Sequence, residues 1–295
     1  MRAMTDTTSP APLPVARSVA DLRARIRAWR AEGLTVGLVP TMGALHDGHL
    51  SLVARARQLA DRVVASVFVN PTQFGPTEDF SRYPRDEAGD AAKLAGAGCD
   101  LLFAPTVPEM YPAGFATSID VGPTADPLEG EHRPGHFQGV ATVVAKLLLQ
   151  SLPDVACFGE KDYQQLQVIR RLVTDLDIPV RIEGVPTLRE PDGLAMSSRN
   201  RYLSAEERAQ AVTVSRVLRT LKQRLSAGTE PVAPALAWGE AELRAAGFSR
   251  IDYVAVVDAA TLQPLERVDR PARALIAAVL GTTRLIDNMA LGPQG

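Results

Sequence analysis

Short apolar runs alternate with amphipathic segments along the chain up to about residue 190. Val36–Val39 is one such run and ends at Pro40, and Val63–Val69 is a second run, rich in β-branched residues. Runs that are apolar on both faces are typical of interior strands of a parallel sheet. We expect further strands where similar runs occur, at 101–104, 154–158 and 180–185.

Between these runs, aliphatic residues recur at the three- and four-residue spacing of a helix. This spacing predicts helices at 49–60, 86–97, 140–150 and 162–176, the last one capped by Asp162. The stretch from 105 to 134 is predicted to be irregular. Strands that alternate with helices form parallel sheets with right-handed crossovers. The predicted fold class is therefore α/β, with a doubly wound parallel sheet.

The pattern changes after Leu188. Ser204 and Glu207 form a capping box that predicts a long helix to about Leu225, and apolar segments at 253–257, 273–280 and 284–286 have hairpin-type spacing. This part is expected to be a small α+β domain. Residues 1–16 are rich in Pro, Thr, Ser and Ala and predict a disordered leader, not a signal peptide. The expected division is 1–16, 17–188 and 189–295.

Composition excludes several classes of protein. Of the 295 residues, 46% are hydrophobic and 22% charged, which is ordinary for a globular chain, and the net charge of −2 argues against a nucleic-acid partner. Cys99 and Cys157 are too few for a disulfide scaffold and lie in apolar stretches, so we expect both to be buried. No apolar run approaches the roughly 20 residues of a membrane span. We expect a soluble cytoplasmic protein.

Polar residues follow several predicted strands, where a doubly wound sheet binds its ligands. His46 and His49 flank Asp47-Gly48 at the start of a predicted helix. Free N–H groups and the helix dipole favour anions there, and two imidazoles would stabilise charge in phosphoryl or nucleotidyl transfer. Two other interpretations stay open, a capping pair on the surface and an imidazole zinc site. The zinc site lacks a His-Glu-x-x-His frame and a thiolate nearby in the sequence.

Other candidates lie at the same predicted sheet edge. Lys161 stands between a strand end and a helix start, and Ser197-Ser198-Arg199 offers two hydroxyls and a guanidinium suited to a triphosphate. Gln73 and Gln165 are neutral amides where a strand-end loop and a helix face could meet. Each of these residues alone could equally be a solvated side chain. His132 and His136 flank a turn, and their role stays open between loop packing, a dimer contact and substrate binding.

Taken together, these segments resemble the pantothenate synthetase family. The pair of histidines is similar to the His-x-Gly-His signature of the nucleotidyltransferase superfamily, and Met196–Arg199 resembles its mobile Lys-Met-Ser-Lys-Ser loop. The family resemblance runs in matching order from about Ser18 to the C-terminus, through the segments 40–49, 68–74, 82–85, 128–130, 133–137, 159–165, 193–200 and 281–288. It implies a Rossmann-like nucleotide- and pantoate-binding domain, a C-terminal lid domain and a homodimer.

The resemblance also implies a reaction. Pantoate would be activated by ATP as an acyl-adenylate and then joined to β-alanine, with release of pyrophosphate and AMP. Catalysis would fall to His46, His49 as proton donor, Lys161 on the phosphates, and the Ser197–Arg199 loop. The ATP site would comprise Met42, Gly43, Ala44, Leu45, His46, Asp47, Gly48, His49, Gly159, Glu160, Lys161, Asp162, Leu188, Met196, Ser197, Ser198 and Arg199.

Gln73 and Gln165 would hold pantoate, and Gln73 would also lie near β-alanine. Mg²⁺ would bridge phosphate oxygens. Its protein ligand is left open, because Gly89 stands where some relatives have an aspartate; Asp90 is the nearest substitute, and water is the other.

Four rival functions remain. Another enzyme of the superfamily would make a dinucleotide or a cytidylyl product, which the Gln73 and Gln165 segments disfavour. A class I tRNA synthetase would need an anticodon-reading domain and a basic surface. A non-catalytic adenine-nucleotide sensor would not need every catalytic residue that the family pattern expects. A structural zinc protein using the histidines would be excluded by metal analysis.

Overall fold

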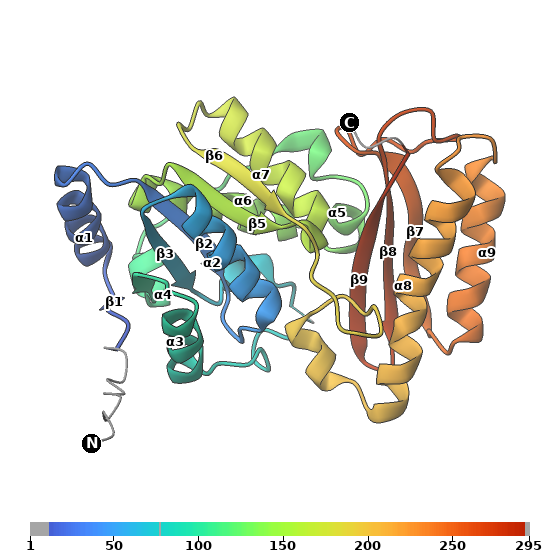
Figure 1. Ribbon diagram of the computed structural model, residues 1–295, viewed down its shortest axis with the longest axis horizontal. Coiled ribbons are helices and arrows are strands. Elements are labelled where there is room, and N and C mark those ends of the chain that lie inside the picture. The colour runs from blue at the N-terminus through green and yellow to red at the C-terminus, as the bar shows by residue number, and fades with distance from the viewer. Residues whose placement is uncertain (1–11, 77, 293–295) are drawn as a thin grey trace, which may run out of the picture.

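The larger sheet consists of parallel strands in the order β1-β4-β3-β2-β5-β6 (Figure 1). The computed structural model describes residues 12–76 and 78–292. The strands of this sheet are β1 (Val15–Ala16), β2 (Val36–Thr41), β3 (Arg62–Val67), β4 (Leu101–Phe103), β5 (Val155–Gly159) and β6 (Arg181–Val185). The predicted α/β class with a doubly wound parallel sheet is confirmed.

The strand order reverses between β2 and β5. From β2 the chain moves to β3 and β4 on one side, and then returns to β5 and β6 on the other side. A crevice opens outside the carboxyl ends of two strands at such a reversal. The segments after Thr41 and after Gly159 therefore meet at one place.

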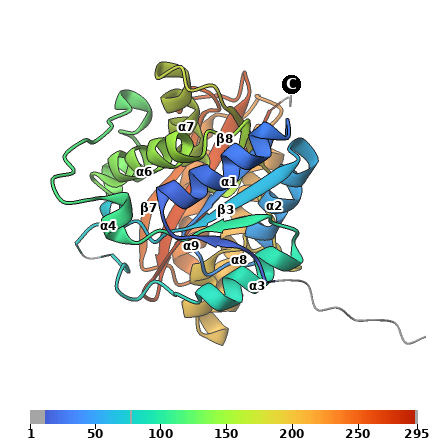
Figure 2. The same ribbon diagram turned by 90° about the vertical axis from the view of Figure 1, so that its left-hand side faces the viewer.

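Helices cover both faces of this sheet (Figure 2). Val36 and Leu38 of β2 pack with α1, α6 and α7, whereas Val39 packs with α2 and α3. This division follows from the alternation of side chains along a strand, and it explains why the strands are apolar on both faces. The helices are α1 (Val19–Ala31), α2 (Asp47–Leu59), α3 (Glu87–Gly96), α6 (His136–Ser151) and α7 (Tyr163–Asp175).

The smaller sheet is antiparallel, in the order β7-β8-β9. Its strands are β7 (Arg250–Asp258), β8 (Ala272–Leu280) and β9 (Thr283–Leu291), and its helices are α8 (Ala205–Leu225) and α9 (Val232–Ala245). Leu218 and Leu221 of α8 share a core with Ile276 of β8. Leu275, on the opposite side of β8, packs with Tyr163 of α7 and so joins the two sheets.

Several local expectations are wrong. Val15–Ala16 is a strand paired with β4, so the leader does not extend to Ala16; residues 1–11 lie outside the described residues. Asp162 precedes α7 but makes no side-chain capping bond. The stretch 105–134 holds two short helices, α4 (Val107–Met110) and α5 (Glu129–His132), and helix α9 was not predicted. The capping box of Ser204 and Glu207 and the burial of Cys99 and Cys157 are confirmed. The boundary near residue 188 stays a prediction.

Candidate functional site

A cleft lies at the carboxyl ends of β2 and β5, where the strand order reverses. It brings together the predicted residues Met42, His46, Gly48, His49, Gln73, Gly159, Lys161, Asp162, Gln165, Leu188, Met196, Ser197, Ser198 and Arg199. The first and the last of these residues, Met42 and Arg199, are more than 150 positions apart in the sequence. The topology alone therefore assembles most of the site.

Asp90 of α3 binds the backbone of the loop that follows β2. Its carboxylate oxygens accept hydrogen bonds from the backbone N–H groups of Ala44 and Leu45, each at 2.8 Å. At Gly43, whose φ is +84°, a Cβ would lie 2.8 Å from Asp90 Oδ2, so only glycine fits there. Asp90 is 1% exposed and does not line the cleft. Its carboxylate shapes the loop, and this arrangement argues against the predicted metal contact.

His46 and His49 form a capping box at the start of α2. His46 Nδ1 accepts from the backbone N–H of Gly48 at 3.1 Å, and His49 Nδ1 accepts from the N–H of His46 at 3.3 Å. Of the interpretation as a capping pair on the surface, the capping part is confirmed, but the surface part is wrong, because both rings line the cleft. Capping also sets the tautomer, because a neutral ring whose Nδ1 accepts carries its proton on Nε2. Each ring then keeps an Nε2–H donor for a ligand in the cleft.

Both rings are neutral near pH 7. Burial, together with the charge of Lys161, lowers the pKa of His46 to about 4. Burial also lowers the pKa of His49 to about 3, with His46 and Lys161 adding to the effect. The ring centroids lie 4.2 Å apart, so the two imidazoles are in contact. As neutral donors they stabilise an anion without forming an ion pair.

Lys161 approaches the same cleft from the end of β5. It lies in the short 3₁₀ helix η3 (Glu160–Asp162), its side chain is 19% exposed, and its ammonium lies 3.8 Å from the carboxylate of Asp162. Asp162 is nearly half exposed, so this contact leaves the cation available to an anionic ligand.

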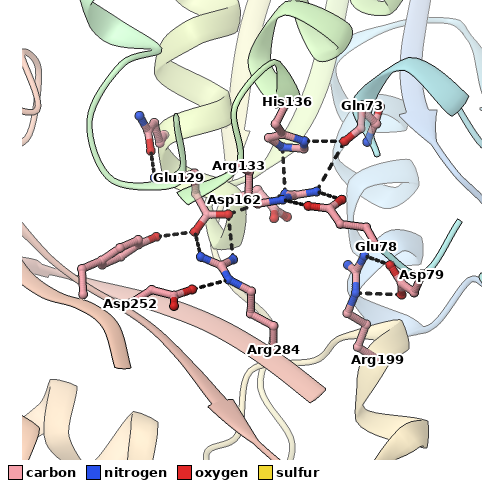
Figure 3. A network of polar contacts seen from close by, with 12 residues as sticks. Gln73, Glu78, Asp79, Glu129, Arg133, His136, Asp162, Arg199, Asp252 and Arg284 are labelled. Carbon is pink, nitrogen blue, oxygen red and sulfur yellow. Dashed lines mark hydrogen bonds and ion pairs between the residues drawn. The ribbon is translucent and has the colours of Figure 1, made fainter. Parts of the chain in front are cut away.

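The loop Met196–Arg199 closes the opposite side. Ser198 donates a hydrogen bond to the carbonyl of Ala44 at 2.9 Å, which ties this loop directly to the histidine segment. Arg199 forms a two-bond ion pair with Asp79, at 2.8 and 3.1 Å (Figure 3). A second arginine, Arg133, pairs in the same way with Glu78 at 2.6 and 2.7 Å. Two neighbouring carboxylates of one loop therefore pair with two arginines that line the cleft, and Arg199 has to exchange Asp79 for a phosphate in order to bind one.

Gln73 is 9% exposed and its amide is oriented by neighbours. Asn70 donates to its Oε1 at 3.0 Å, and its Nε2 lies 3.2 Å from the sulfur of Met42. Helix α6 packs closely against this segment at Gly139, where a Cβ would lie 2.3 Å from the carbonyl oxygen of Thr72. Gln165 of α7 lines the same cleft.

Arg133 and His136 also line the cleft; the sequence left the role of His136 open and gave none to Arg133. His136, at the start of α6, contacts the carbonyl of Gln73 through Nδ1 at 2.9 Å and Arg133 through Nε2 at 3.0 Å. Burial and the charge of Arg133 lower the pKa of His136 to about 4. His132 lies instead beside the ring of Tyr253, with centroids 5.9 Å apart. The turn Arg133–Gly135 before an apolar helix was the available signal.

An apolar wall completes the cleft. It is made by one side of α6 and the end of β5, namely Val140, Val143, Val144, Leu147 and Phe158. Together with the neutral amides, this wall suits a small ligand that has both aliphatic and polar groups.

Some predicted residues do not line the cleft. Ala44 and Leu45 are buried at 3% and 2% exposure, and Glu160 pairs with Arg273 at 2.9 Å. Gly43 and Asp47 are also absent from the lining. These residues shape the segments that carry the site, so a direct ATP contact is not supported for their side chains.

Comparisons with known proteins agree with this arrangement. The family model described as Pantoate-beta-alanine ligase matches residues 14–290. A pantothenate synthetase of Paramagnetospirillum magneticum is 64% identical over 279 residues, which cover 95% of this chain and 98% of the relative. That of Rhodospirillum rubrum is 61% identical over 280 residues and covers 95% and 99%.

Solved structures give the same result. A pantothenate synthetase from Thermus thermophilus has a TM-score of 0.89 at 53% identity and covers 95% of this chain and 100% of its own. A pantoate-beta-alanine ligase from Francisella tularensis, complexed with beta-gamma ATP and beta-alanine, has a TM-score of 0.80 at 34% identity and covers 94% and 97%.

Proposed function

The chain belongs to the pantoate–β-alanine ligase family, and we propose that its cleft between β2 and β5 is where it carries out this family's reaction. The enzyme condenses pantoate with β-alanine at the expense of ATP. Pantoate's carboxylate attacks the α-phosphorus, pyrophosphate leaves, and the amine of β-alanine then attacks the acyl carbon of pantoyl-adenylate and releases AMP. The observation that carries the proposal is the convergence of His46, His49, Lys161, Arg199 and Gln73 on one cleft.

The first step brings a carboxylate against a triphosphate, so negative charge must be neutralised. We assign Lys161 and Arg199 to the phosphates as cations, and His46 and His49 as neutral Nε2–H donors. Ser197 and Ser198 add hydroxyls from the same side. Donors fixed before the reaction stabilise developing charge without reorganisation. The capping bonds of α2 supply this fixation for both histidines.

Gln73 and Gln165 would orient pantoate, with the apolar wall of α6 against its aliphatic part. A neutral amide holds the substrate without an ion pair to its carboxylate, and such a pair would lower the nucleophilicity of that carboxylate. The amide of Gln73 is held by Asn70 and faces Met42, so it is rigid enough for this role. In the second step β-alanine would approach on the Gln73 side.

Magnesium would enter with ATP. Asp162 is the one carboxylate that lines the cleft in the described part of the chain, and no cluster of three or more metal-binding side chains occurs there. Mg²⁺ commonly binds through one or two carboxylates together with substrate phosphates and water. Asp162 fits that pattern better than the enclosed Asp90. The ion would supply further positive charge at the phosphates.

We also propose a cytoplasmic homodimer with no nucleic-acid partner. Both cysteines are free and buried, as expected in a reducing compartment.

The ends of α6 and α7 offer apolar surface to a second copy. Three leucines there are each more than half exposed, namely Leu149, Leu152 and Leu176. Light scattering during size-exclusion chromatography measures the mass directly, and a monomer at micromolar concentration would refute the dimer. In the residues described, no helix has the length and hydropathy needed to span a bilayer.

Two variants with different expected defects test where the substrates bind, at Gln73 for pantoate and at Lys161 for the phosphates. Gln73→Glu places a like charge beside the pantoate carboxylate and should abolish adenylate formation while ATP still binds. Lys161→Ala should weaken ATP-dependent steps. Full adenylation by Gln73→Glu would refute the neutral-amide argument, and unchanged kinetics in both variants would move the site elsewhere.

A further inference from the structure

Strand β9 of the smaller sheet carries two consecutive buried polar residues, Asp287 and Asn288, at 4% and 3% exposure. Successive side chains of a strand point to opposite faces of the sheet. The two residues therefore reach different segments although they are neighbours in the chain. Both segments belong to the cleft, and the mechanism described above gives neither residue a role.

Asn288 holds the segment that carries Lys161. Its Nδ2 donates to the carbonyl oxygens of Glu160 and Lys161, at 2.9 and 2.8 Å. Its Oδ1 accepts from Arg273 Nε at 2.7 Å, and Arg273 also donates to the carboxylate of Glu160 at 2.9 Å. The guanidinium of Arg273 in turn lies 4.0 Å from the ring centroid of Tyr163. The backbone of η3 is therefore fixed by the smaller sheet.

Asp287 holds the segment that leads to the Met196–Arg199 loop. It forms a two-bond ion pair with Arg189, at 2.7 and 3.0 Å. Arg189 pairs in a β-bridge with Ala195, and the N–H of Met196 donates to the carbonyl of Leu188 at 3.0 Å. Arg189 also donates to the carbonyl of Asn288 at 3.3 Å. Asp287 is therefore linked through Arg189 to the backbone that leads into the Met196–Arg199 loop.

We propose that Asp287 and Asn288 are positioning residues for the adenylation step, because they set the separation between Lys161 on one side of the triphosphate and Ser197–Arg199 on the other. The proposal rests on the function proposed above. Misplacement of catalytic groups by about 1 Å can cost on the order of 10²-fold in rate. A rigid strand that holds both segments through adjacent residues prevents such a displacement.

The alternative is that these contacts only hold the two sheets together. The two roles differ in what they do to each half-reaction. Pyrophosphate leaves in the first half-reaction, so the second half, attack of β-alanine on pantoyl-adenylate, no longer needs the triphosphate contacts. A positioning defect should therefore fall on the first half, whereas loss of folded protein would lower both halves equally.

Asn288→Asp and Asp287→Asn are the test variants, since both keep the shape of the side chain. Asn288→Asp removes the donors to Glu160 and Lys161, and Asp287→Asn removes the charge that faces Arg189. Ile251→Val is the matched control: Ile251 lies in β7 of the same sheet, packs against its core, pairs with Ala278 and does not line the cleft, and the change removes a single methylene. Pantoate-dependent pyrophosphate release and the reaction of supplied pantoyl-adenylate with β-alanine are measured separately.

We expect pyrophosphate release to fall about 10- to 100-fold in both test variants, chiefly in kcat, with the second half-reaction within about threefold of the parent. Ile251→Val should leave both halves unchanged. Equal losses in the two halves, or adenylation at the parent rate, would overturn the proposal. If the parent protein itself releases no pyrophosphate with pantoate while folded, the proposed function has failed instead, so the two failures are distinguishable.

Discussion

The carboxylate of Glu129 and the guanidinium of Arg284 form a two-bond ion pair, at 2.7 and 2.8 Å, between residues 155 positions apart (Figure 3). Arg284 also donates to Asp252 at 2.7 Å, and the hydroxyl of Tyr253 donates to Glu129 at 2.7 Å. Burial alone would raise the pKa of Glu129, but the bonds from Arg284 lower it to about 2. This network joins α5 to the smaller sheet beside the cleft.

Removal of Glu129 should therefore destabilise the protein strongly. Glu129→Ala removes the partner that Arg284 and Arg133 share, but Arg284 keeps Asp252 and Arg133 keeps Glu78, so we expect a cost at the lower end of the about 3–5 kcal/mol typical of a broken buried pair. Asp175→Ala, which breaks the exposed pair with Arg171, is the control and should cost less than about 1 kcal/mol. Urea unfolding at pH 7 measures both values. Equal losses in the two variants would contradict the assigned importance of the network.

Loss of a phosphate-facing donor should slow adenylation with the fold preserved. For His46→Ala, His49→Ala and Lys161→Ala we expect a fall of about 10²–10³ in the rate of pantoate-dependent pyrophosphate release. The histidine variants should also lose about 0.5–2 kcal/mol of stability, because each removes part of the capping box of α2. Lys222→Ala, in the last turn of α8, is the charge-matched control. A Lys161→Ala enzyme at the parent rate would refute the phosphate assignment.

Gly139 should be intolerant of a side chain. In Gly139→Ala the new Cβ would lie 2.3 Å from the carbonyl of Thr72, so η1 (Pro71–Gln73) must shift and take Gln73 with it. We expect a raised KM for pantoate and a largely unchanged KM for ATP, measured by steady-state kinetics. Gly96→Ala, at an open position in α3, should leave both values unchanged. Equal changes in the two KM values would contradict the placement of pantoate beside Gln73.

Stability should fall as the solution is made mildly acidic. The pKa of His136 is lowered to about 4 in the folded protein, from 6.5 for the free side chain. Between these values the unfolded chain binds more protons, so the free energy of unfolding decreases as pH falls from 6.5 to 4. This lowering corresponds to on the order of 3 kcal/mol for a single histidine. His46 and His49 contribute in the same direction.

Replacement of His136 measures how much of this pH dependence of the unfolding free energy it causes. His136→Gln should flatten the dependence of unfolding free energy on pH between 6.5 and 4, as measured by urea titrations at several pH values. His132→Gln changes the other histidine of that loop and serves as the control. An unaltered slope in His136→Gln would show that His136 is not the group responsible.

Periodicity in the sequence was enough for strands β2 to β6 of the larger sheet, because strands that are buried on both faces leave continuous apolar runs such as Val63–Val69. It failed for β1, since two residues, Val15 and Ala16, carry no periodicity. Asp162 illustrates a different limit. An aspartate before a helix predicts a cap, yet here the 3₁₀ turn of η3 intervenes and the side chain makes no capping bond.

For the site, the sequence predicts the residues that line the cleft better than the residues that hold them in place. His46, His49, Lys161 and Arg199 lie in short segments after strands, so the topology predicts that they converge. The partners that hold them are remote in the sequence: Asp90 binds the loop after β2, and Asn288 binds the segment of Lys161. A buried aspartate that accepts two backbone bonds and one that binds a metal look alike in a sequence. Only the packing of α3 under the loop separates them.

In the proposed mechanism, pantoate is the nucleophile in this cleft. Pyrophosphate release from purified protein with ATP and Mg²⁺, measured with and without pantoate and then with β-alanine added, tests it most directly. We predict release that requires pantoate, and AMP with an amide product only when β-alanine is present. Folded protein that binds ATP but releases no pyrophosphate in response to pantoate would refute this mechanism.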